Sequence, residues 1–249
     1  MAKFQVGDTA YVPVQRVSDA VVAPYAIIRG TVTEVPEHSK SIRVDLPHDL
    51  GNRSIAASAA HKDVGILILR IGDFDTEVTL LDPLAGSIHQ YCRLLVPDDQ
   101  LKSVYLRTWS ELQFIIERHH AAYSHWILIG HGGAGVLNFA NNHHLPVGEL
   151  CNHLEQQNVN EKLIVSLCCH TGERAFASTL SASNSCKAFI APKGAVHGAG
   201  ASQFAQSFLG YHFLEGRTVT VAFKQTRLQT PGGAVFRLWS GGGLEQGQH

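Results

Sequence analysis

Short stretches in which apolar and polar residues alternate run through residues 1–72. Such alternation is typical of half-buried β-strands, and a more continuous apolar run follows them. Short strands at this spacing predict a small all-β barrel, and we place its end at residue 72. The predicted strands are residues 9–14, 23–35, 41–46 and 64–74, with turns at 7–8, 36–40 and 48–52.

The pattern changes in residues 73–240, where apolar strands alternate with segments of helical periodicity. This alternation predicts an α/β fold with a mostly parallel sheet and helices on both faces. A glycine-rich tail at residues 241–249 is expected to be disordered. The expected strands are residues 77–85, 103–108, 125–133, 162–172, 187–196 and 234–240. The expected helices are residues 109–123, 147–157, 173–183, 201–216 and 218–228. A hairpin is expected at residues 135–147.

Composition narrows the class of protein further. The 249 residues are 45% hydrophobic and 16% charged, which suits a globular chain with a substantial core. A net charge of −1 gives no reason to expect a nucleic acid or an anionic membrane as a partner. No apolar run approaches the ~20 residues of a membrane-spanning helix. Five cysteines without a C-x-x-C pair, behind an N-terminus with no signal-peptide pattern, predict free thiols in a reducing cytoplasm.

Two of the expected buried strands end in reactive side chains. The strand at 125–133 ends in His131 and two glycines, and the strand at 162–172 ends in Cys168, Cys169, His170 and Thr171. Reactive groups of open α/β sheets gather at the carboxyl ends of the strands. One helical crossover separates the two strands, so we expect their ends to lie side by side.

A cysteine nucleophile needs a base that takes the thiol proton and later gives it to the leaving group, and histidine does both near neutral pH. Acyl transfer also needs N–H donors for the developing oxyanion. Gly132 and the nucleophile itself are the natural donors. The start of a helix near Glu173 adds a positive potential that lowers a thiol pKa.

The order of these motifs resembles the caspase-like (clan CD) cysteine peptidases, and is nearest to the bacterial CHAT group. The resemblance rests on ILIGHGGAGVLNFANNHHLPVGEL followed by LIVSLCCHTGE, and it extends over about residues 75 to 240. The segments FQVGDTAYVP and GTVTEV resemble the first strands of SH3-like barrels. The resemblance implies a caspase-like sheet preceded by an SH3-like barrel.

Carried over to this chain, the family pattern makes His131 the general base and acid and Cys169 the nucleophile. Cys169 is selected because Thr171-Gly172 follows it at the offset of the motif. Cys168 stands where the family has a small residue, and strand alternation turns it to the opposite face. The N–H groups of Gly132 and Cys169 would form the oxyanion hole, with no metal and no other cofactor.

Two departures from the family concern the substrate pocket. Caspases carry Arg or Gln after the nucleophile, whereas this chain has His170. Relatives that cleave after Lys or Arg have an acidic residue in the loop corresponding to residues 191–202, which here contains none. The candidate pocket residues are therefore Asp82, His170 and His197.

The resemblance implies a cysteine endopeptidase with a protein substrate, an effector in a bacterial defence or cell-death module. Its barrel would be regulatory, or would dock a regulatory protein. The alternative is a catalytically silent caspase-like scaffold whose barrel binds a partner. A metal site at His143, His144, Cys151 and His153, with His119 and His120, lacks a recognised ligand spacing. A serine hydrolase would need a G-x-S-x-G elbow, which the sequence lacks.

Overall fold

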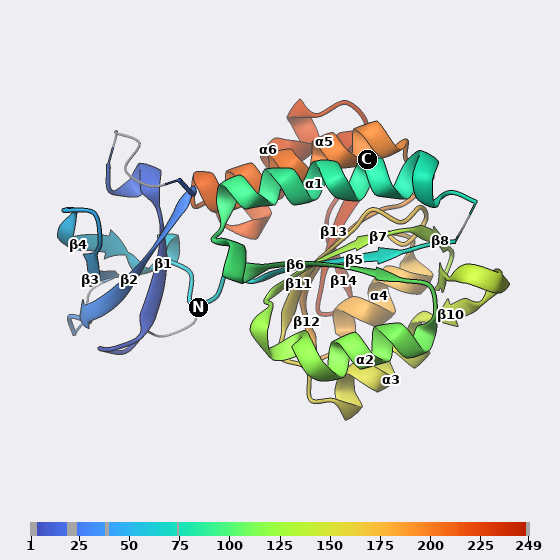
Figure 1. Ribbon diagram of the computed structural model, residues 1–249, viewed down its shortest axis with the longest axis horizontal. Coiled ribbons are helices and arrows are strands. Elements are labelled where there is room, and N and C mark those ends of the chain that lie inside the picture. The colour runs from blue at the N-terminus through green and yellow to red at the C-terminus, as the bar shows by residue number, and fades with distance from the viewer. Residues whose placement is uncertain (1–3, 19–23, 38–39, 74, 248–249) are drawn as a thin grey trace.

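A small antiparallel sheet lies beside a larger α/β unit in the computed structural model (Figure 1). The structure describes residues 4–18, 24–37, 40–73 and 75–247. Residues 23 and 74 of two predicted strands, residues 38–39 of a predicted turn and residues 248–249 of the predicted tail lie outside these ranges. Among the described residues, no helix combines the length and apolarity needed to cross a membrane.

The N-terminal sheet has four strands that pair in chain order, each antiparallel to the next. Alternate residues such as Ile42, Val44 and Leu46 point into its core, as the sequence pattern predicts. The fourth strand was not expected from the sequence. Closure into an SH3-like barrel stays a prediction. The strands are β1 (Thr9–Pro13), β2 (Ile27–Glu34), β3 (Ser41–Leu46) and β4 (Gly51–Ala56).

The larger unit is built on a seven-stranded sheet in the order β14-β13-β12-β11-β7-β5-β6. The five strands from β12 to β6 in this order are parallel, and the two at the other edge are antiparallel. The prediction of a mostly parallel sheet is thereby confirmed. The strands are β5 (Ile66–Ile71), β6 (Leu101–Leu106), β7 (His125–Ile129), β11 (Lys162–Ser166), β12 (Cys186–Pro192), β13 (Phe236–Ser240) and β14 (Gly243–Gln246).

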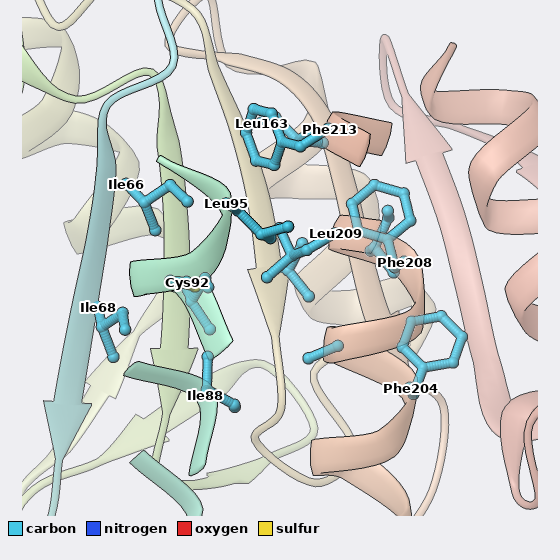
Figure 2. Close-up of a cluster of buried hydrophobic side chains, with 14 of the residues drawn as sticks. Ile66, Ile68, Ile88, Cys92, Leu95, Leu163, Phe204, Phe208, Leu209 and Phe213 are labelled. Atoms are coloured by element: carbon cyan, nitrogen blue, oxygen red, sulfur yellow. The ribbon is translucent and has the colours of Figure 1, made fainter. Parts of the chain in front are cut away.

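Helices cover both faces of this sheet, as expected (Figure 1). Strand alternation divides the core: Ile66 and Ile68 face one layer, whereas Leu67 and Leu69 face the other. Figure 2 shows the first layer, in which Phe204 and Phe208 join side chains from α1 and the sheet. The first layer contains α1 (Asp82–Leu95), α5 (Gly198–Leu209) and α6 (Val219–Gln229); the second contains α2 (Trp109–His119), α3 (Val147–Gln156) and α4 (Arg174–Ala182).

Shorter elements complete the chain. A three-stranded antiparallel sheet leaves the carboxyl edge of the large sheet and confirms the expected hairpin. Its strands are β8 (His131–Gly133), β9 (Val136–Asn138) and β10 (His144–Pro146). Wide π-helical turns span Glu77–Leu81 and Gly210–Leu214. Short 3-10 turns span Val14–Arg16, Ala57–Ala59, Asp98–Gln100, His120–Ala122, Ala140–Asn142 and Gly233–Val235.

Three expectations about local structure are corrected. The strand β5, assigned to the barrel, pairs with β6 and β7, so the large sheet begins before residue 72. Its almost unbroken apolar sequence suits a strand buried on both faces. The predicted strand at 77–85 is helical, because its apolar residues continue at helical spacing through α1. The tail is not disordered at Gly243–Gln246, where β14 pairs with β13.

Three histidines, of which His125 and His212 are buried and His61 is partly buried, lie where the N-terminal sheet meets the larger unit. His61 forms a bridge with Tyr11 of β1 and packs edge-on against His212, at 5.0 Å between ring centroids. The Nε2 atoms of His125 and His212 are 3.3 Å apart. Phe213 packs against all three rings. The junction between the two units is therefore built on imidazole rings that the fold removes from water.

Candidate active site

The two strands that carry the candidate residues are direct neighbours. β7 and β11 pair in parallel, with Ser166 opposite Leu128 at the carboxyl end. The chain continues from β7 into β8 with His131, and from β11 into the turn with Cys168 and Cys169. The sequence-based expectation that these strand ends lie together is confirmed.

The two adjacent cysteines lie in different environments. Cys168 is fully buried in the core layer beneath α4, and burial raises the pKa of its thiol to about 12. Cys169 is partly exposed. Its Sγ lies 3.4 Å from the backbone N and 3.9 Å from the backbone O of Val196, in the loop before α5. Of the two thiols, only that of Cys169 is open to a substrate.

A ring of hydrogen bonds fixes the turn that holds Cys169. The Thr171 hydroxyl donates to the carbonyl of Cys168 at 2.8 Å, and the Ser166 hydroxyl lies 2.8 Å from Thr171 Oγ1. The Cys168 N–H donates to Ser166 Oγ at 3.2 Å. Because each hydroxyl has a single proton, the ring is consistent only if Ser166 donates to Thr171. The buried hydroxyl of Thr171, in the Cys-x-Thr-Gly motif, thus stabilises the turn that holds Cys169.

Gly172 and His170 shape the same turn. A Cβ at Gly172 would lie 2.4 Å from the carbonyl oxygen of Ala191 in β12, so the turn can pack on that strand only as glycine. His170 has φ 64°, in the left-handed region that costs a non-glycine residue about 1 kcal/mol. Its N–H donates to the carbonyl of Gly194 at 3.2 Å, and its Nδ1 lies 2.6 Å from Glu173 Oε1. These contacts hold His170 in a conformation that it would not otherwise favour.

Gly132 brings the histidine strand against the cysteine turn. A Cβ added to it would lie 2.7 Å from the carbonyl oxygen of Cys169 and 2.8 Å from Thr171 Cγ2. Gly133 and Val136 flank the two-residue turn between β8 and β9, so they form a hydrogen-bonded pair. Because hydrogen-bonded and non-hydrogen-bonded pairs alternate along an antiparallel ladder, Gly132 and Leu137 form a non-hydrogen-bonded pair. The N–H of Gly132 therefore points away from β9. In the described part of the chain, the Cys169 N–H donates to no other group. Both N–H groups are therefore free to bind a ligand oxygen.

The side chain of His131 is held by a pair of residues that sequence reasoning missed. Its Nε2 lies 2.7 Å from Thr76 Oγ1, and the Thr76 hydroxyl donates to Asp73 Oδ1 at 2.8 Å. Since the threonine proton goes to Asp73, Thr76 accepts from an Nε2–H of His131. That tautomer leaves Nδ1 unprotonated and able to accept a proton. In the described part of the chain, His131 and Cys169 make no hydrogen bond with each other.

Asp73 is suited to this role because it stays ionised. Backbone and side-chain hydrogen bonds from Thr76 hold its pKa below the usual value, and the nearby His131 lowers it further. The N–H of Asp75 also donates to Asp73 Oδ1, at 3.1 Å. The sequence signal was an Asp three residues before a Thr, directly after a buried strand, which is typical of a side chain that caps its own turn.

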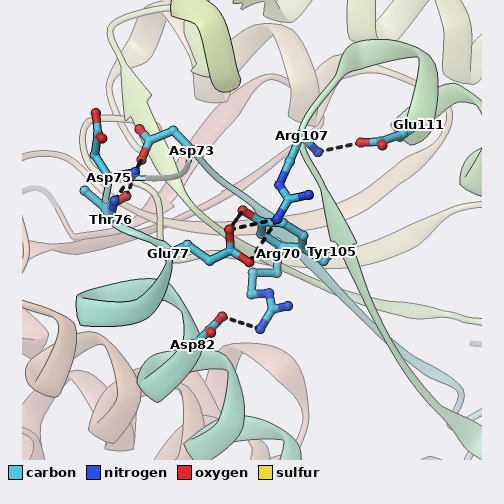
Figure 3. A network of polar contacts seen from close by, with 9 residues as sticks. All are labelled: Arg70, Asp73, Asp75, Thr76, Glu77, Asp82, Tyr105, Arg107 and Glu111. Carbon is cyan, nitrogen blue, oxygen red and sulfur yellow. Dashed lines mark hydrogen bonds and ion pairs between the residues drawn. The ribbon is translucent and has the colours of Figure 1, made fainter.

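A polar network extends from this turn along the carboxyl edge of β5 and β6 (Figure 3). Glu77 accepts from the Tyr105 hydroxyl at 2.6 Å and from Arg107, and the hydrogen bond from Tyr105 is the main cause of its lowered pKa. Asp82, a predicted pocket residue, accepts from Arg70 at 2.6 Å. Its charge is therefore already paired at the first turn of α1.

The other two predicted pocket residues, His170 and His197, lie at the starts of different helices and have different partners. His170 pairs with Glu173 at the start of α4. His197 caps the N-terminus of α5, where its Nδ1 accepts from the N–H of Ala199 at 3.2 Å. His197 also lines an open groove of about 590 Å³ between α1 and α5. It directly follows Val196, whose backbone contacts the Cys169 thiol.

The residues considered for a metal site make other contacts. His144 lies 2.8 Å from Asn138 Oδ1, and His153 packs edge-on against Trp109. Among the described residues, no cluster of three or more His, Cys, Asp or Glu side chains is arranged to hold a metal ion.

Comparison with solved structures finds similar chains, among them a caspase. The crystal structure of caspase-1 from Spodoptera frugiperda aligns with a TM-score of 0.45 and 13% sequence identity, covering 71% of this chain and 85% of that chain. No family model matches the sequence, and no curated protein matches it either.

Proposed function

We propose that the protein is a caspase-like cysteine endopeptidase, nearest to the CHAT group, that cleaves a protein substrate. The observation that carries the proposal is the contact between Gly132 and the backbone of Cys169. It brings the strand of a histidine that contacts Thr76 against the partly exposed member of the cysteine pair. The N–H groups of Gly132 and Cys169, which belong to these two segments, supply the donors that the proposal needs.

The reaction follows from these groups. His131 Nδ1 takes the proton of the Cys169 thiol, and the thiolate attacks the carbonyl carbon of the scissile peptide bond. The oxygen becomes an oxyanion bound by the N–H groups of Gly132 and Cys169. As the C–N bond breaks, His131 returns the proton to the leaving amine and an acyl-enzyme remains. Water, deprotonated by His131, then hydrolyses the thioester and regenerates the thiol.

Thr76 and Asp73 would support the histidine through each proton transfer. The hydrogen bond from Nε2–H to Thr76 keeps the neutral ring in the tautomer that exposes Nδ1. The ionised Asp73 behind Thr76 stabilises the imidazolium that forms when the thiol is deprotonated. This is the orienting role that a third residue has in catalytic triads, divided here between two side chains.

A matched pair of variants tests the proposal. Cleavage of a casein or peptide-library substrate by the full chain should be abolished in Cys169→Ala and retained in Cys168→Ala, with circular dichroism as the check on folding. Loss of cleavage in Cys168→Ala alone would show that Cys168, and not Cys169, is the nucleophile. Cleavage that neither substitution changes would mean that the site at Cys169 does not perform it, which would favour the alternative of a silent scaffold.

We further propose that the N-terminal unit, SH3-like in kind, docks a regulatory or substrate protein and that the enzyme acts in a bacterial defence or cell-death module. The strand β4 lies at an edge of its sheet, and five of its six residues, all but Ile55, are exposed. All five cysteines are free thiols, which supports a reducing cytoplasmic setting. Charge reversal at exposed Arg53 should slow cleavage of a protein substrate and leave cleavage of a short peptide unchanged; equal effects on both would contradict docking.

A further inference from the structure

We propose that the groove between α1 and α5 binds the residue before the scissile bond and selects an uncharged side chain that is apolar along its stem and polar at its tip, such as glutamine. This inference rests on the proposed function, because it assumes that Cys169 attacks a peptide. It goes further by naming the substrate class from the walls of the groove.

The position of the groove connects it to both catalytic side chains. On one side, Val196 contacts the Cys169 thiol, and the next residues, His197 and Gly198, line the groove. On the other side, Thr76 contacts His131, and the chain continues into Thr79 and Leu80, which line the opposite wall. A Cβ at Gly198 would lie 2.7 Å from Leu80 Cδ1, so the two walls meet at this point. Through Val196 and Thr76, both walls of the groove are continuous in sequence with residues that contact the catalytic side chains, and we infer that a peptide held at Cys169 reaches the groove.

The walls determine which side chain fits. Apolar contacts come from Leu80, Pro83 and Leu84. Farther along the helices, Gln206 donates to Ser87 and Ser202 at 2.8 Å each, and these hydroxyls form a neutral polar patch. A side chain with a methylene stem and an amide tip would contact both parts of the groove. The volume of the groove, about 590 Å³, lies within the range of small-molecule pockets and is ample for one side chain.

The absence of charged side chains from the described lining disfavours a charged substrate residue in the groove. None of the described side chains that line the groove is Asp, Glu, Lys or Arg. The nearest carboxylate in sequence, Asp82, is paired with Arg70. An Asp, Glu, Lys or Arg of the substrate would lose water in the groove without gaining an opposite charge, which disfavours its binding. The sequence-based expectation of a pocket at His197 is thereby extended to α1.

Fluorogenic peptides of the form acetyl-Ala-Ala-X-aminomethylcoumarin test the proposal with the full chain. With X as Gln, kcat/KM should exceed that for X as Asp or Lys by about tenfold or more. Ser202→Lys places a cation in the groove and should raise the ratio of Asp to Gln cleavage by about tenfold. Ser207→Lys on the same helix, outside the lining, should leave the ratio unchanged. Equal or better cleavage after Asp or Lys by the wild type would overturn the proposal.

A binding experiment separates this inference from the proposed function. Cys169→Ala is mixed with fluorescein-labelled Ala-Ala-X-Ala-Ala peptides, and anisotropy gives the dissociation constant for each X. Tighter binding of the Gln peptide supports the groove even if the wild type cleaves nothing, in which case only the peptidase proposal fails. Cleavage by the wild type with a charged preference leaves the peptidase intact and refutes the groove. Absence of any preference in binding, or of any binding, also refutes it.

Discussion

Acid should weaken the junction between the N-terminal sheet and the larger unit, because the rings of His61, His125 and His212 are packed there in the neutral form. Burial lowers the pKa of His61 to about 3 and that of His212 to about 4, and lowers that of His125 well below its usual value. His61 Nε2 is buried without a hydrogen-bond partner in the described part of the chain. Lys187 lies near all three rings and disfavours a further positive charge.

The magnitude follows from the difference in pKa between the folded and unfolded chains. An unfolded histidine titrates near 6.5, so above that pH neither state binds a proton and the stability is fully present. As the pH falls below 6.5, the unfolded chain binds protons that the folded chain cannot, and the folded state loses about 1.4 kcal/mol per pH unit for each histidine. At pH 4.5, His61 and His212 together would lower the unfolding free energy by about 5 kcal/mol, which is comparable to the total stability of many domains.

Urea unfolding between pH 7.5 and 4.5 measures this loss. In His61→Leu, one titrating ring and its unpaired nitrogen are removed, so the fall in unfolding free energy should shrink by about 2.7 kcal/mol relative to the wild type. His143→Leu, which changes an exposed histidine, serves as the control and should keep the wild-type pH dependence. The reasoning is refuted if His61→Leu loses stability with acid as steeply as the wild type.

Other predictions concern the site itself. Gly172→Ala should destabilise the fold by about 1–3 kcal/mol in urea unfolding, because its Cβ would clash with the Ala191 carbonyl, whereas Gly148→Ala, where nothing lies near the added carbon, should not destabilise it. Gly132→Ala should lower kcat by about 10²-fold or more, since its Cβ would push the strand away from Cys169; unchanged kinetics would mean that this contact does not shape the site. Thr76→Val should lower kcat/KM by about 10–100-fold and alter its pH profile, with activity restored in Thr76→Ser; a profile identical to that of the wild type would contradict the orienting role.

The residues at the strand ends could be predicted because they lie inside strong local patterns. His131 and Cys169 each follow a fully buried strand, and pairing of parallel strands joins their ends without further information. Strand alternation and the Thr-Gly turn also separated Cys168 from Cys169. The burial of Cys168 agrees with that reasoning.

The support behind His131 could not be predicted in the same way. Thr76 is 55 residues from His131 in sequence and meets it only because β5 lies next to β7. The sequence pattern placed β5 in the barrel, since an apolar strand carries no mark of the sheet to which it belongs. The groove was missed for a related reason: residues 77–85 were taken as a strand, and only their continuation into α1 reveals a helix.

The central claim is that Cys169, activated by His131, is the nucleophile. Treatment of the full chain with a peptidyl acyloxymethyl ketone, followed by digestion and mass spectrometry, locates the thiol that attacks. We expect the adduct on Cys169, and we expect its rate of formation to fall by at least about 10²-fold in His131→Ala. An adduct on Cys168, or a rate on Cys169 that does not depend on His131, would contradict this account.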